Sequence, residues 1–179
     1  MPHRPDRPLQ NTPRARAPLY TPAERARRDA SKWTMVQGVL APLQFLVFAV
    51  SLVLVLRFLS TGEGFFAATV SILVKTFVLY TIMVTGAIWE HDVFGRYLFA
   101  PAFFWEDVVS FLVITLHTVY LYGLLTGALD ARQQMYVALA AYATYLANAA
   151  QFLLKLRAAR LDAQPRSTGP IVNSMKYAE

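Results

Sequence analysis

The residues best suited to chemistry lie in one stretch rich in acids and aromatic rings, residues 89–107. Glu90 and His91 stand near its start, and Glu106 and Asp107 stand at its end. A carboxylic acid at the edge of an apolar region can hold a proton near neutral pH and deliver it to a substrate. This stretch therefore favours acid–base chemistry.

The residues that the chain lacks exclude other kinds of chemistry. It has no cysteine, so disulfides, iron–sulfur clusters and thiol nucleophiles are excluded. It has no glycine-rich phosphate-binding motif and no histidine pair at metal-binding spacing, and a single histidine within the apolar runs cannot hold a haem from both sides. We therefore expect no redox cofactor and no metal ion of the protein's own.

Four long apolar runs must position the acidic stretch. The chain is 56% hydrophobic and only 16% charged. At about 1.5 Å per residue each run is long enough to cross a hydrocarbon layer of about 30 Å. Four buried core helices of this kind would leave a soluble bundle without polar faces. We predict an all-α, polytopic membrane protein whose spans cover about residues 36–59, 65–89, 108–126 and 135–155 within a domain of residues 33–157.

Basic residues predict the orientation of these spans. The chain has 17 Lys and Arg against 11 Asp and Glu, and with both termini in the cytoplasm 14 of the basic residues lie inside against two outside. The positive-inside rule then predicts an N-in, C-in protein. Residues 1–32 are rich in proline and arginine, so we expect a mostly disordered tail that meets anionic lipid rather than nucleic acid. Residues 158–179 form the second cytoplasmic tail.

A polar stripe follows each predicted span. Because a helix turns about 100° per residue, positions seven or eleven apart lie on nearly the same face. Near mid-membrane the stripes hold Gln44, Lys75, His117 and Asn148, and at the cytoplasmic edge they hold Glu90, Glu106, Asp107 and Lys155. Polar groups in a membrane usually face the bundle interior. We expect a four-helix bundle whose polar interior opens toward the cytoplasm under the 89–107 loop.

Each of these features also has a purely structural explanation. A single amide within a span more often joins neighbouring helices than binds a ligand. Trp89, Phe104 and Trp105 fit an interfacial aromatic belt as well as a ligand site. His117 fits a hydrogen-bonding residue as well as a metal ligand. Lys75 is harder to explain, because an ammonium at mid-membrane costs at least about 2.5 kcal/mol and demands a partner or a wet cavity.

Five segments carry a resemblance to a known family. They are RDASKWTMVQGVLAPLQF at 28–45, VKT at 74–76, TGAIWE at 85–90, LFAPAFFWED at 98–107 and NAAQFLLK at 148–155. From about residue 19 to about residue 161 the chain resembles the 3-vinyl bacteriochlorophyllide hydratase family of anoxygenic phototrophs. The two tails lie outside this resemblance.

The resemblance implies a hydro-lyase of bacteriochlorophyll a synthesis. Such an enzyme adds water across the C3 vinyl group of a chlorophyllide or bacteriochlorophyllide and forms the 3-(1-hydroxyethyl) pigment. The implied partners are a magnesium chlorin or bacteriochlorin substrate, the lipid of a bacterial inner membrane and neighbouring pigment-synthesis enzymes. The implied active site faces the cytoplasm. Hydration needs an acid and a base but no redox cofactor.

Position and chemistry suggest catalytic roles within this reaction. We expect Glu106 or Glu90 to donate the proton and Asp107 or His91 to orient or deprotonate the water. A carboxylate near the developing cation would also lower the barrier electrostatically.

Other residues are expected to hold the pigment. His117 is a candidate axial ligand of the pigment magnesium, and Arg96, Lys155 or Lys32 could bind its propionate. The expected substrate-binding set is His117, Lys75, Trp89, Phe104, Trp105, Arg96, Gln44, Asn148 and Lys155.

Two other classes of protein fit parts of the pattern. A non-catalytic carrier or assembly factor for a tetrapyrrole or quinone needs the aromatic rim but no titratable acid. A small transporter could use Lys75 and His117 as a proton relay, although no inverted repeat is visible. Gly38, Ala41 and the spacing of Gly123 and Gly127 would let helices approach across a homodimer.

Overall fold

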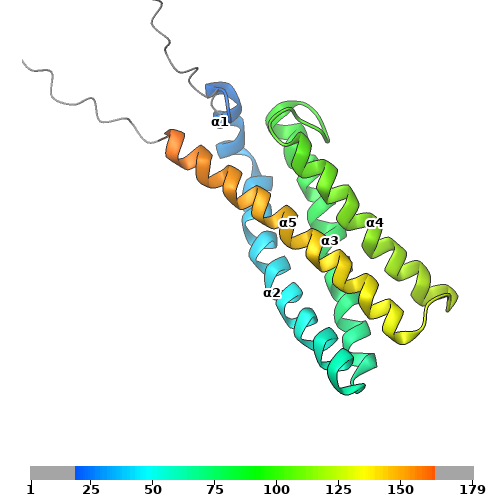
Figure 1. Cartoon of the computed structure of the whole chain (residues 1–179). Helices are drawn as coiled ribbons and strands as arrows, with labels where there is room; N and C mark the ends of the chain where they lie inside the picture. The colour runs from blue at the N-terminus through cyan, green and yellow to red at the C-terminus, as the bar shows by residue number, and fades with distance from the viewer. Residues whose placement is uncertain (1–18, 164–179) are drawn as a thin grey trace, which may run out of the picture.

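The computed structural model describes residues 19–163, with side chains to residue 160, and this part of the chain is helical. The helices are α1 (Pro22–Ala30), α2 (Lys32–Thr61), α3 (Phe65–Phe94), α4 (Phe104–Thr126) and α5 (Ala131–Ala163). In Figure 1, α2 to α5 lie side by side in one elongated bundle, and the first and last described residues lie at the same end of it. We call this the α1 end, formed by α1, the 95–103 connection and the last turns of α5.

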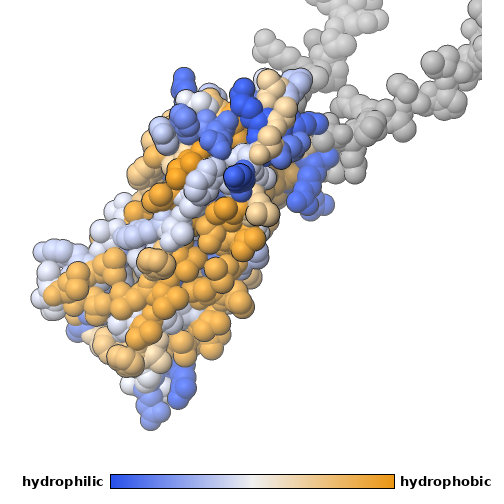
Figure 2. Space-filling model, turned by 180° about the vertical axis from the view of Figure 1, so that it is seen from behind, coloured by the Kyte–Doolittle hydropathy of each residue, from blue (hydrophilic) through white to orange (hydrophobic). Residues whose placement is uncertain are grey.

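The four long helices have the length and apolar composition of membrane spans. They are Lys32–Thr61, Phe65–Phe94, Phe104–Thr126 and Ala131–Arg160. On the face that Figure 2 shows, hydrophobic residues cover much of the middle of the bundle and hydrophilic ones gather at its two ends. The predicted all-α fold with four spans is thus confirmed, while the side of the membrane on which the termini lie stays a prediction.

The helices extend past the predicted spans, mainly at the α1 end. Residues 32–35, 90–94, 104–107 and 156–163 continue the helices beyond the predicted spans, and each of these segments includes polar or charged residues. Helix geometry does not require apolar residues once the chain leaves the hydrocarbon, so hydropathy alone underestimates these lengths. The predicted disorder of the tails concerns mainly residues 1–18 and 164–179, which lie outside the described residues.

Two antiparallel hairpins make up the bundle. Contacts between helices are concentrated within the α2–α3 and α4–α5 pairs, and fewer join one hairpin to the other. The main apolar core lies between the hairpins, and its buried members include Phe48, Val55, Ile72, Val113, Tyr120 and Met135. The polar residues considered below lie along this same seam between the hairpins.

Two glycines shape the α4–α5 turn. Gly127 ends α4 with φ +66°, in the left-handed region that favours glycine. At Gly123 a Cβ atom would lie 2.6 Å from Leu129 Cδ1, so any larger residue would require the Leu129 side chain to shift. The spacing of these glycines thus has a role within one chain, and the homodimer stays a prediction.

Helix α1 lies in the segment 1–32 that the sequence analysis expects to be mostly disordered. Thr21 and Glu24 form a capping box at its start, in which each side chain bonds the other residue's backbone N–H. These hydrogen bonds hold the pKa of Glu24 below its usual value. Arg27 Nε donates to the Val93 carbonyl at 2.7 Å, and Ser31 Oγ donates to Asp92 at 2.8 Å. These contacts attach α1 to the last turn of α3.

Replacing Arg27 by alanine is expected to loosen α1. The bond from its guanidinium to the Val93 carbonyl is charge-assisted, and bonds of this kind contribute roughly 1.5–3 kcal/mol. We expect limited trypsin digestion in detergent to cut after Arg28 about tenfold faster in Arg27→Ala, because cleavage follows local opening. Arg25→Ala is the matched control, since Arg25 makes no side-chain hydrogen bond to any described residue. Equal cutting rates in the two variants would assign the attachment of α1 to apolar packing instead.

Candidate active site

Three buried carboxyl groups meet at the α1 end. Glu90 lies near the end of α3, and Glu106 and Asp107 lie in the first turn of α4, with exposed fractions of only 5%, 6% and 4%. The N-terminus of a helix favours negative charge, which suits the two acids on α4. The structure therefore brings together three of the four residues that the sequence analysis proposes as catalytic.

The 95–103 connection presents two consecutive backbone amides to this cluster. Phe99 N donates to Asp107 Oδ2 at 2.7 Å, and Ala100 N donates to Glu90 Oε2 at 3.2 Å. Phe99 has a positive φ of 58°, a backbone strain that costs about 1–3 kcal/mol in a non-glycine residue. Such strain persists where the surrounding contacts demand it, and here it aims both amides at carboxyl groups.

Glu90 and Asp107 accept from two consecutive backbone amides, so their buried carboxyl groups lie close together. Two negative charges side by side in a buried site repel each other, and the Lys155 cation is already paired with Glu106. We therefore expect one of the two carboxyl groups to keep its proton. This is the property required of a general acid.

Glu106 has a different partner. Its carboxylate forms an ion pair with Lys155 of α5, and the Lys155 ammonium also donates to the Ala102 carbonyl. Lys155 Nζ lies 5.0 Å from the centre of the Phe103 ring. The cation holds Glu106 as an anion beside the Glu90–Asp107 pair. Lys155, expected to bind the pigment, is thus engaged within the protein.

An aromatic layer covers the three carboxyl groups. It consists of Tyr20, Trp89, Phe94, Phe103 and Phe152. Phe103 is 1% exposed, and its ring stacks on that of Phe152 with centres 5.8 Å apart. Trp89 Nε1 donates to Thr34 Oγ1 at 2.9 Å, which turns its indole inward. This layer separates the acids from water at the α1 end.

Tyr20 belongs to this site although it lies in a segment whose composition predicts disorder. Tyr20 is buried, which raises the pKa of its phenol, and the Arg28 guanidinium lies 4.9 Å from its ring centre. A local signal was present, because Thr21 and Glu24 have the spacing of a capping box and follow an apolar pair. That pattern predicts the start of a helix and apolar residues just before it that pack against other apolar side chains.

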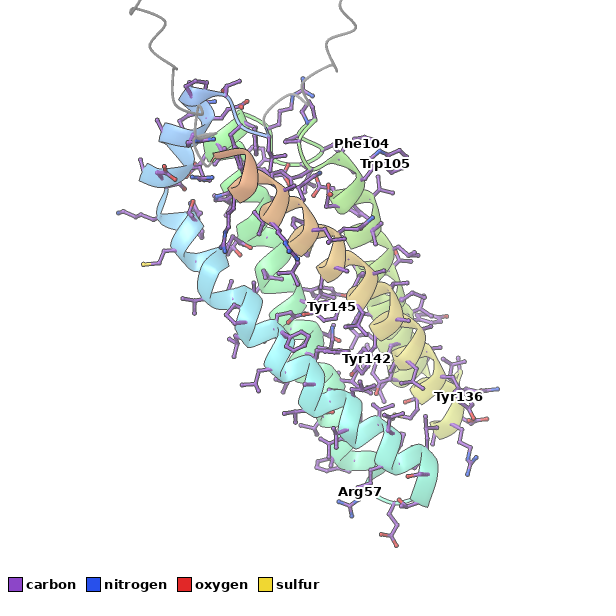
Figure 3. The ribbon with its side chains drawn as sticks, turned by 60° about the vertical axis from the view of Figure 1, so that its left-hand side comes forward. Arg57, Phe104, Trp105, Tyr136, Tyr142 and Tyr145 are labelled. Atoms are coloured by element: carbon purple, nitrogen blue, oxygen red, sulfur yellow. The ribbon has the colours of Figure 1, made fainter. Side chains whose placement is uncertain are left out.

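Four candidate residues lie apart from the cluster. Phe104 and Trp105 are 43% and 68% exposed, and Figure 3 shows both side chains projecting outward from the first turn of α4. His91 is exposed and stacks on Tyr97, with ring centres 4.3 Å apart. Arg96 is exposed on the connection that follows α3. All four lie on the outer surface at the α1 end.

A second polar cluster lies deep in the bundle. Lys75 Nζ lies 3.1 Å from His117 Nε2, and both side chains are almost completely buried. His117 Nδ1 lies 2.8 Å from the Val113 carbonyl, which can only accept, so Nδ1 carries the hydrogen and Nε2 accepts from Lys75. Both ring nitrogens of His117 are therefore engaged. Coordination of the pigment magnesium by His117 would require Lys75 to move away.

Aromatic rings complete the surroundings of Lys75. Its Nζ lies 4.3 Å from the centre of the Tyr145 ring and 5.2 Å from that of Tyr142. Tyr142 in turn hydrogen bonds Ser51 at 2.5 Å. Figure 3 shows the two tyrosines on α5 within the bundle. A buried ammonium in a membrane needs a partner, and Lys75 finds it in the His117 imidazole and in the faces of the Tyr142 and Tyr145 rings.

Gln44 and Asn148 lie between these two clusters. Gln44 is 2% exposed on α2, and Asn148 Nδ2 donates to Ser110 Oγ at 2.7 Å. Among residues 19–160 no three His, Asp or Glu side chains are placed to hold a metal ion. The structure thus offers acids, cations and amides, arranged in layers along one seam.

Fold and site together define a multi-pass membrane protein with a cluster of buried acids at one end of its helix bundle. The sequence model of the 2-vinyl bacteriochlorophyllide hydratase family matches residues 20–158, so the chain belongs to that family. The family predicted from the sequence is thereby confirmed, with the description reading 2-vinyl where the sequence analysis has 3-vinyl.

Two similar proteins have the same description, 2-vinyl bacteriochlorophyllide hydratase. The one from Rhodobacter capsulatus is 66% identical over 166 residues, which cover 92% of this chain and 96% of the relative. The one from Cereibacter sphaeroides is 72% identical over 144 residues, which cover 80% and 89%. No solved structure matches the chain.

Proposed function

We propose that this protein is a hydro-lyase that adds water to the vinyl group of a bacteriochlorophyllide or chlorophyllide. Its two relatives are named for this hydration and share most of its length. The observation that carries the mechanism is the buried pair of carboxyl groups, Glu90 and Asp107, which two consecutive backbone amides hold beside the Glu106–Lys155 ion pair. Acid–base addition of water needs no redox cofactor, so we propose that the enzyme uses none.

The first step is proton transfer to carbon. The proton held by Glu90 and Asp107 moves to the terminal vinyl carbon, where the π electrons of the double bond form the new C–H bond. Positive charge then develops on the carbon attached to the ring, and the conjugated macrocycle delocalises it. The carboxylates of Glu106 and of the deprotonated pair stabilise this cation electrostatically, and apolar cover strengthens that effect.

The second step is attack by water. The oxygen of a water molecule bonds to the cationic carbon, and the carboxylate pair accepts the proton that this oxygen loses. The pair thus returns to its starting state, and the pigment has gained one water molecule as a 1-hydroxyethyl group. Because the proton given and the proton received balance, the cycle consumes only water and pigment.

The outward aromatic residues suit a flat pigment that arrives through the membrane edge. Phe104 and Trp105 offer exposed rings next to the helix turn that holds Glu106 and Asp107. With Lys155 committed to Glu106, Arg96 and Lys32 are the expected cations that remain exposed for the pigment propionate. The placement in a bacterial inner membrane, with the α1 end toward the cytoplasm and near other pigment enzymes, is part of this proposal.

The test is hydration in labelled water. Detergent-solubilised protein is incubated with a 3-vinyl (bacterio)chlorophyllide in ¹⁸O-labelled water, and the pigment is followed by absorbance and mass. We expect the gain of one labelled water and a blue shift of the red absorption band, because the vinyl group leaves the conjugated system. A binding shift without a gain in mass, also after addition of reductant, nucleotide or partner proteins, would instead indicate a non-catalytic pigment carrier.

A further inference from the structure

Three amide side chains along the seam between the hairpins have buried polar atoms without hydrogen-bond partners among the described residues. These atoms are Gln44 Nε2 and Oε1, Asn148 Oδ1 and Gln151 Oε1. Gln44 differs in this from Gln37 on the same helix, whose Nε2 donates to Thr85 at 2.8 Å. An unpartnered amide is costly in a protein interior, so these atoms call for a polar occupant.

The register of the helices places Gln44 opposite the turn of α5 that holds Asn148 and Gln151. Ser51 hydrogen bonds Tyr142, and Phe48 packs on Tyr145 with ring centres 5.0 Å apart. A step of three residues toward the α1 end along α2 therefore corresponds to a step of three residues in the same direction along α5. One more turn toward the α1 end brings Gln44 opposite residues 148–149. Asn148 and Gln151 are three apart on α5 and share a face.

The free atoms match the hydrogen-bonding pattern of water. Gln44 Nε2 is a donor, and the oxygens of Gln44, Asn148 and Gln151 are acceptors. A water molecule accepts from such a donor and gives its two hydrogens to such acceptors, and buried waters typically make about three bonds. One water molecule can therefore bond three of these four atoms, which the chain's own side chains leave without partners.

This level lies next to the acids. Asn148 bonds Ser110, which follows Glu106 and Asp107 by one turn of α4, about 5 Å. The aromatic layer described above covers the acids at the α1 end, with Phe103 1% exposed. Water that reaches the carboxyl groups from the polar seam does not have to cross that layer.

We propose that Gln44, Asn148 and Gln151 form a buried water site that supplies the water molecule consumed in hydration. The inference rests on the proposed function and adds to it the place from which the second reactant comes. These residues are positioning residues, because they act on the pigment through the water that they hold. In this arrangement the proton and the water approach the vinyl group from neighbouring turns of the same seam.

The decisive variant is Gln44→Met, which keeps the length of the side chain but removes both polar atoms. We expect kcat for hydration to fall at least about tenfold, because a misplaced reactant costs one to two orders of magnitude, while KM for the pigment stays within about twofold. Gln37→Met is the matched control on the same helix, and it should keep kcat. If Gln44→Met does not fold, Gln151→Met tests the same level of the seam.

A second readout needs no pigment. If the amides hold water, removal of Gln44 breaks hydrogen bonds, and the melting temperature of the pigment-free protein should not rise. A higher melting temperature with undiminished hydration would show a dry, unpaired amide and overturn the proposal, as would a raised KM at unchanged kcat, which indicates direct pigment contact. Hydration of pigment by the unaltered protein tests the proposed function separately, so the two proposals can fail independently.

Discussion

Glu90→Gln is expected to reduce the hydration rate by at least about a hundredfold while the pigment still binds. A positioned general acid typically contributes about 10²–10⁴ to the rate. The glutamine amide keeps an oxygen that can accept from the Ala100 N–H, so the shape of the site is preserved. It cannot, however, release a proton to the vinyl carbon. The measurement is kcat by absorbance together with a pigment-binding titration.

Two further variants, Glu63→Gln and Asp107→Asn, accompany this test. Glu63→Gln alters an exposed acid in the α2–α3 connection at the far end of the bundle and should leave the rate unchanged. Asp107→Asn should resemble Glu90→Gln, because the two side chains share one proton. Full activity in Glu90→Gln would remove this pair from the mechanism and leave Glu106 as the donor to be tested by Glu106→Gln.

Helical periodicity predicted much of this arrangement because membrane spans restrict the alternatives. Once hydropathy defines a span, the helix face and the membrane depth of each polar residue in it follow from its position. Because neighbouring spans run in opposite directions, these depths show which residues on different helices lie at the same level. That reasoning placed Lys75 and His117 at one level and Glu106 with Lys155 at another, and in the structure each of these pairs is in contact. Both contacts join residues on different helices, which local sequence patterns cannot show.

The direction of individual side chains could not be predicted in the same way. Four aromatic residues, Trp89, Phe103, Phe104 and Trp105, fall within one stretch, yet Phe103 is buried and Trp105 is mostly exposed. The difference arises because α4 begins at Phe104, and a helix start sends successive residues to different faces. Neither the boundary residue nor the course of the 95–103 connection follows from composition.

Helix α1 shows a second limit of composition. A segment rich in arginine and proline has little apolar surface to bury, and this argued for disorder. The helix forms because its contacts are tertiary, among them Arg27 with Val93 and Tyr20 with Phe103. Long-range contacts of this kind override local propensity, and only the capping box was visible in advance.

The ion pair of Glu106 and Lys155 gives the largest expected effect on stability. Lys155→Met leaves the Glu106 carboxylate buried without its cation, and breaking a buried pair on one side costs about 3–5 kcal/mol. For a chain of this size that corresponds to a melting temperature lower by about 10 °C in detergent. The double variant Glu106→Gln, Lys155→Met removes both charges and should recover much of the loss, because no unpaired charge then remains.

The same pair of variants separates two roles of Lys155. Arg157 is an exposed basic residue two positions further along α5, and Arg157→Met is the control for the loss of a positive charge at the α1 end. Recovery in the double variant would show that Lys155 is needed chiefly to neutralise Glu106. If the double variant melts as low as Lys155→Met, the bond from Lys155 to the Ala102 carbonyl is the contact that matters. In that case Lys155 stabilises the connection before α4, and with it the position of both acids on that helix.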